Sequence, residues 1–124
     1  MIQMNSTSKL VVSGILILVT IVFGFLIHKY GKPYNTALFT IHKLTTLGFV
    51  VLLSFLVVNY SKMNTLSIDF TVCLIIAILS LIGLFVSGAL MSLEKLQNEM
   101  LLIHRIATPV FVVCIIYLFW RLLK

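Results

Sequence analysis

The sequence contains three histidines, His28, His42 and His104, and each lies in or beside a strongly apolar stretch. An imidazole in such surroundings can bind a metal ion, carry a proton or hydrogen-bond to a neighbouring group. Ionisable residues inside membrane-spanning segments are costly, and by default they mark functional sites. The histidines are therefore the first candidates for a site.

Two of these histidines belong to a short internal repeat. Residues 41–51 read IHKLTTLGFVV and residues 103–113 read IHRIATPVFVV, so six of eleven positions are identical at an offset of 62 residues. Identical Val and Ile residues are weak evidence for a repeat, because these residues are common in any apolar segment. The matched His, Thr and Phe, and the cation after each histidine, carry the similarity. The repeat pairs His42 with His104.

The composition sets the environment of the pair. Of 124 residues, 61% are apolar and 10% are charged, with a mean hydropathy of +1.21. Soluble domains are about a quarter charged, so an ordinary globular protein is excluded, and so is a disordered chain. The net charge of +6 comes from basic residues scattered singly at the ends of apolar runs. Lipid headgroups, and not nucleic acid, are their expected partners. The sequence predicts an integral membrane protein.

Turn and capping signals divide the chain into four apolar segments, each near the roughly 20 residues that cross a bilayer. The first ends at Gly31-Lys32-Pro33, and it is too long and lacks the cleavage site of a secretory signal. Asn35 is the expected N-cap of the second segment, and the third and fourth segments are expected to start after Asn64 and Asn98. We expect one transmembrane domain, residues 1–124, with helices at about 9–30, 36–59, 65–91 and 99–122.

Short loops make successive helices antiparallel neighbours, and a lipid-exposed sheet edge is excluded. The expected fold is an all-α antiparallel four-helix transmembrane bundle, built from two helical hairpins related as a parallel repeat. Both termini then lie on one side, and all three histidines lie at the other end. His42 and His104 lie roughly 9 to 11 Å inside their helix starts.

Two histidines related by a pseudo-two-fold axis can face each other across it. A ligand on that axis receives one imidazole from each side, which is the geometry of bis-histidine haem. We therefore predict one haem b with His42 and His104 as axial ligands of its iron. Cys73 and Cys114 have no metal-ligand spacing, and we interpret them as packing residues.

Neighbouring residues fit a flat, wide ligand. Lys43 and Arg105 follow the histidines and can pair with two haem propionates, although snorkelling towards the headgroups is an alternative. Phe49 and Phe111 can pack on the macrocycle or simply in the core. Small residues in the first and third helices can admit the macrocycle, or serve helix packing or a homodimer. They are Gly24, Gly83, Ser87 and Gly88.

With the histidine pair placed, the chain resembles the small four-helix membrane b-type cytochromes. These include quinol-oxidising bacterial cytochromes and haem-bearing membrane anchors of respiratory complexes. The resemblance rests on the architecture and on I-H-[KR] at 41–43 and 103–105, and it covers the chain loosely. It implies a prokaryotic cell membrane and electron transfer between membrane quinol and a redox protein or larger complex. Many di-haem members use four histidines, whereas this chain has none on the termini side, which argues for one haem.

His28 lies nearer the headgroups, where it is either an interfacial residue or a contact for quinol or a proton. Two other functions stay open: a non-haem Zn, Cu or Ni site for transport or sensing, and a structural or assembly subunit. No catalytic triad or phosphate-binding loop is present, so an enzymatic role would be that of a quinol-linked oxidoreductase or its haem subunit. If Lys43 and Arg105 pair with propionates, four basic residues remain on the termini side and three on the histidine side. This excess favours cytoplasmic termini.

Overall fold

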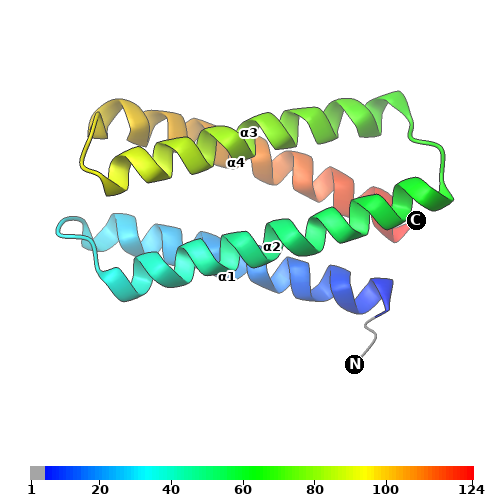
Figure 1. The fold of residues 1–124 in the computed structure, drawn as a ribbon, viewed down its shortest axis with the longest axis horizontal. Helices are drawn as coiled ribbons and strands as arrows, with labels where there is room; N and C mark the ends of the chain where they lie inside the picture. Colours follow the sequence, from blue (N-terminus) through cyan, green and yellow to red (C-terminus); the bar gives the residue numbers. More distant parts are fainter. Residues whose placement is uncertain (1–4) are drawn as a thin grey trace. The chain divides into compact units, whose positions relative to one another are not determined.

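The computed structural model describes residues 5–124, and these form four α-helices joined by short loops (Figure 1). Each helix has 25 to 28 residues, which corresponds to about 37 to 42 Å of length. Each therefore exceeds the roughly 30 Å hydrocarbon core of a bilayer, and each is apolar enough to cross it. The helices are α1 (Ser6–Tyr30), α2 (Thr36–Met63), α3 (Ile68–Ser92) and α4 (Gln97–Leu123).

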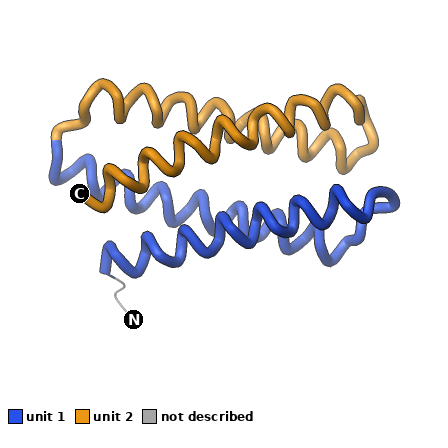
Figure 2. Tube along the Cα trace, turned by 180° about the vertical axis from the view of Figure 1, so that it is seen from behind, with its two compact units in different colours: residues 1–64 blue, residues 65–124 orange. Residues whose placement is uncertain are grey.

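The helices group into two compact units (Figure 2). Unit 1, residues 1–64, is the hairpin of α1 and α2, and unit 2, residues 65–124, is the hairpin of α3 and α4. Within each unit the two helices run antiparallel and pack against each other along their length. The predicted all-α fold of helical hairpins is thereby confirmed.

Large apolar side chains cover the outer surfaces of both hairpins. Leu18 and Phe25 of α1 are each 64% exposed, and Val113 and Ile116 of α4 are 66% and 63% exposed. Apolar surface this extensive is not stable in water, because a soluble monomer exposes only limited apolar patches. Lipid is its natural solvent, and the chain is an integral membrane protein.

The first helix begins earlier than its apolar run. The Asn5 side chain accepts a hydrogen bond from the Ser8 N–H at 2.7 Å, so α1 starts at Ser6 and not at the predicted residue 9. The predicted stop is confirmed. Gly31 has φ of +64° and donates its N–H to the Ile27 carbonyl, and this left-handed backbone angle suits glycine.

Asn35 and Asn64 have opposite capping roles. Asn35 accepts from two N–H groups of the first turn of α2, at 2.9 and 3.2 Å, which confirms it as an N-cap. Asn64 instead closes the other end of α2, because its backbone N–H and side-chain amide both donate to the Tyr60 carbonyl. The predicted end of the second helix at residue 59 and the predicted start of the third directly after Asn64 are therefore wrong: α2 continues to Met63, and α3 begins only at Ile68.

The fourth helix begins at Gln97, two residues before the predicted start. Its N-cap is Leu96, which has left-handed backbone angles (φ 47°, ψ 45°) and makes no side-chain capping bond. Asn98 lies inside the first turn, so the predicted helix start after Asn98 is wrong. At their other ends, α3 and α4 each extend one residue past the predicted limits of 91 and 122.

Candidate functional site: one anchored histidine in each hairpin

In unit 1, His42 on α2 is half-buried and turned towards α1. Its Nδ1 lies 2.8 Å from the backbone carbonyl oxygen of Thr20. A carbonyl only accepts hydrogen bonds, so Nδ1 carries the proton and donates it. In the neutral ring the lone pair is then on Nε2. A histidine that ligates a metal typically shows this arrangement, with its other nitrogen donating to a backbone carbonyl.

The close approach of His42 to α1 depends on Gly24. A Cβ placed on Gly24 would lie 3.0 Å from Cε1 and 3.3 Å from Nδ1 of the imidazole, closer than carbon atoms normally pack. Gly24 is one turn after Thr20, so its missing side chain leaves the Thr20 carbonyl accessible to the ring. Gly24 was predicted to make room for a macrocycle, and in the structure it makes room for the imidazole.

Threonine hydroxyls fix the helix around His42. Thr46, one turn later, donates to the His42 carbonyl at 2.7 Å. Thr45 and Thr20 hydroxyls lie 2.8 Å apart and link α2 to α1. Thr20 thus contacts both the imidazole and the helix that carries it, and sequence reasoning missed this role. The only sequence feature that marks Thr20 is that it is a hydroxyl residue in an apolar helix, one turn before a glycine.

In unit 2, His104 on α4 is held by Ser87 on α3. The Ser87 Oγ lies 2.9 Å from Nδ1 of His104, and Ser87 is fully buried. The same hydroxyl also lies 3.2 Å from the Leu84 carbonyl oxygen. A serine oxygen that donates its proton to Leu84 accepts from Nδ1–H, and in that tautomer the neutral His104 ring has its lone pair on Nε2.

The surroundings of His104 repeat those of His42 more loosely. Thr108 donates to the His104 carbonyl at 2.7 Å, as Thr46 does in unit 1. A Cβ on Gly88 would lie 3.8 Å from the imidazole Cε1, an ordinary contact, and a Cβ on Gly83 would meet nothing within 4 Å. Each hairpin thus carries a histidine on its second helix, held through Nδ1 by its first helix and packed beside a glycine.

The other predicted residues fall into two groups. Phe49 and Phe111 are buried, at 1% and 6% exposure. His28, Lys43 and Arg105 are exposed, and the Lys43 Nζ lies 4.2 Å from the centroid of the Phe39 ring. The convergence of His42 and His104 on one centre would join the two units, and it stays a prediction.

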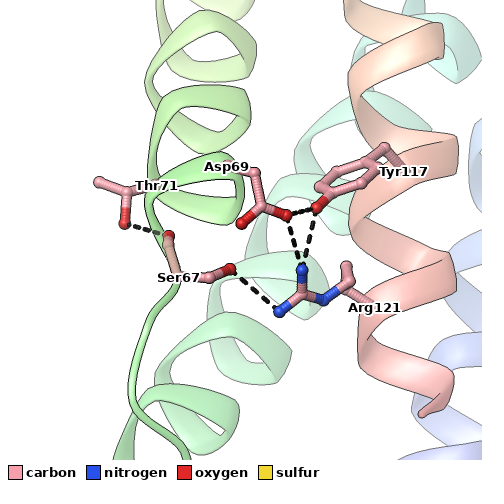
Figure 3. Close-up of polar contacts among 5 residues, drawn as sticks. All are labelled: Ser67, Asp69, Thr71, Tyr117 and Arg121. Atoms are coloured by element: carbon pink, nitrogen blue, oxygen red, sulfur yellow. Dashed lines mark hydrogen bonds and ion pairs between the residues drawn. The ribbon is translucent and has the colours of Figure 1, made fainter.

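A polar cluster that was not predicted joins the other end of unit 2 (Figure 3). Arg121 donates to the Asp69 carboxylate at 2.6 Å and to the Ser67 hydroxyl at 3.0 Å. The Tyr117 hydroxyl donates to the same oxygen of Asp69. Arg121 is seventeen residues beyond His104 on α4, about 25 Å along the helix. The cluster therefore fixes the register of α3 and α4 and takes no direct part in the histidine site.

Among residues 5–124, no group of three or more His, Cys, Asp or Glu side chains is placed to hold a metal ion. A haem iron needs only two ligands from the protein, because the porphyrin supplies the other four. Comparison with protein-family models, curated proteins and solved structures finds no match for this chain. The geometry of the two histidines is therefore the basis for a function.

Proposed function

We propose that this chain is a membrane b-type cytochrome that binds one haem, with His42 and His104 as the protein ligands of its iron. The observation that carries the proposal is the matched state of the two rings. In each hairpin Nδ1 lies within hydrogen-bond distance of an oxygen on the preceding helix, and a ring that donates from Nδ1 has its lone pair on Nε2. Two such nitrogens are the donor set that six-coordinate haem requires of a protein.

The surrounding residues support the same proposal. Gly24 and Gly88 let each ring approach its neighbouring helix, and the open space beside Gly83 can accept the edge of a macrocycle. Lys43 and Arg105 are exposed next to the ligands and can neutralise two propionates. Phe49 and Phe111 supply apolar packing two turns away. These assignments follow the internal repeat, so each hairpin contributes equivalent groups.

The proposed chemistry is transfer of single electrons, which haem iron supplies when it is bound. With His42 and His104 both bound to it, haem iron would have no open position, so oxygen chemistry at the metal would be disfavoured. The histidines lie towards one end of their helices, which leaves most of the roughly 30 Å membrane core unbridged. Exchange between membrane quinol and a redox protein at that face fits this position, with His28 as a quinol or proton contact, in a prokaryotic membrane with cytoplasmic termini.

The proposal is tested by the absorption spectrum of the detergent-purified protein, produced with a supply of haem. We expect a Soret band and the sharp α-band of reduced low-spin haem. His42→Ala and His104→Ala should each abolish the low-spin signal, because either change removes one axial ligand. His28→Ala is the matched control and should retain it.

A wild-type protein without a Soret band would refute the haem proposal, and metal analysis would then separate a non-haem metal site from a structural subunit. Low-spin haem that survives either ligand substitution would show that the ligands are assigned wrongly.

A further inference from the structure

The two hairpins differ sharply in charge. Residues 1–64 contain five lysines and neither aspartate nor glutamate, whereas all three acidic residues of the chain follow residue 64. Three of the five lysines, Lys29, Lys32 and Lys43, lie at or near the loop between α1 and α2, and all three are exposed. No carboxylate within unit 1 can neutralise them. This end of unit 1 therefore presents an uncompensated positive surface.

Aromatic rings organise the same surface. The rings of Tyr34 and Phe39 stack, with centroids 6.4 Å apart and planes inclined by 11°. The Lys43 Nζ lies 4.2 Å from the centroid of the Phe39 ring, and Phe39 is one turn nearer the loop than Lys43. The lysine side chain thus extends from the interior of the helix towards the loop. Snorkelling lysines and interfacial tyrosines mark the depth of the lipid headgroups.

The loop of unit 2 offers a contrast within the same molecule. Between α3 and α4 the chain carries Glu94 and Lys95, and Glu99 follows in the first turn of α4. Together with Arg105, the repeat equivalent of Lys43, this end of unit 2 has two carboxylates and two basic residues, and so no excess of positive charge. The α1–α2 loop end thus differs in charge from the α3–α4 loop end.

We propose that the α1–α2 loop end of unit 1 binds the headgroups of anionic phospholipids. The phosphodiester is the complement of closely spaced lysines at the membrane surface. A lipid is favoured over an acidic protein because the Lys43 ammonium lies over Phe39, a residue within the apolar span of α2. The two lysines that the test changes, Lys29 and Lys32, have no role in the proposed haem site.

The test compares retention of phosphatidylglycerol and phosphatidylcholine by the full chain, measured by native mass spectrometry after extraction from mixed nanodiscs. We expect the wild type to retain phosphatidylglycerol preferentially. The double variant Lys29→Gln, Lys32→Gln should lower that preference by about five- to twenty-five-fold, since each lysine at an anionic surface contributes a factor of roughly five. Lys9→Gln, Lys62→Gln removes the same charge from the other end of unit 1, which lacks the Tyr34–Phe39 pair, and should lower the preference less than the Lys29, Lys32 variant does.

Equal retention of both lipids by the wild type would overturn the proposal, as would an unchanged preference in the Lys29, Lys32 variant. Binding of polyglutamate to the wild type in phosphatidylcholine discs, without any lipid preference, would assign the surface to an acidic protein instead. Should the variant fail to fold, judged by its helical circular dichroism, the wild type alone decides. Its preference must fall as salt is raised, and a salt-independent preference would contradict the proposal.

Discussion

At the scale of the residue, each histidine is held by one acceptor and one small neighbour. His42 uses a backbone carbonyl, which no side-chain substitution at Thr20 removes, and His104 uses the hydroxyl of Ser87. A Cβ added to Gly24 would lie 3.0 Å from Cε1 of His42, whereas a Cβ added to Gly88 would lie 3.8 Å from Cε1 of His104. The two hairpins should therefore respond differently to equivalent substitutions.

Gly24→Ala should displace the His42 ring and lower the amount of haem bound per chain. The new methyl group would lie 3.0 Å from Cε1, and overpacking of this kind costs roughly 1–3 kcal/mol. Gly88→Ala is the matched control, because its methyl group would make only an ordinary contact. The haem-to-protein absorbance ratio measures the effect, and equal loss in both variants would contradict the packing described for Gly24.

Ser87→Ala should raise the reduction potential of the haem by roughly 20–60 mV, which corresponds to a hydrogen bond of about 0.5–1.5 kcal/mol. The Nδ1–H bond to Ser87 makes the His104 imidazole a stronger donor and so favours the oxidised iron. A redox titration followed at the α-band measures the shift. Ser92→Ala removes an exposed serine of the same helix and should leave the potential unchanged. A lowered potential in Ser87→Ala would contradict the assigned direction of the hydrogen bond.

At the scale of the element, the apolar runs were sufficient to predict four helices, and Asn35 and Gly31 were read correctly as helix ends. The third helix does not start directly after Asn64, because asparagine can also close a helix C-terminus, as it does for α2. Both histidines of the repeat have a threonine one turn later that donates to the histidine carbonyl. The partners Thr20 and Ser87 could not be predicted. The register between two uniformly apolar helices depends on side-chain fit, and no periodicity in the sequence reports it.

The capping assignments make a prediction for helix stability. Asn35→Ala should destabilise unit 1 by about 1 kcal/mol, because two N–H groups of α2 lose their acceptor. Asn98→Ala should be nearly neutral, since Asn98 lies inside the first turn of α4. Thermal unfolding in detergent, followed by helical circular dichroism, compares the two variants. A larger loss of stability in Asn98→Ala would indicate that Asn98 is the cap and contradict the structure.

At the scale of the whole molecule, the two hairpins have similar histidine surroundings but differ in charge. Each anchors one imidazole, while unit 1 alone presents a surface of unneutralised lysines. The cluster of Asp69, Tyr117 and Arg121 fixes the register of unit 2 from the end opposite its histidine.

The number of haems per polypeptide is the clearest test of whether His42 and His104 of one chain bind the same haem. Haem is extracted from the purified protein and quantified as its pyridine complex, against protein measured by amino-acid analysis. The account predicts one haem per chain, and none in either His42→Ala or His104→Ala. One haem for every two chains, or half the wild-type content remaining in a single-histidine variant, would show that the histidines pair between copies and not within one chain.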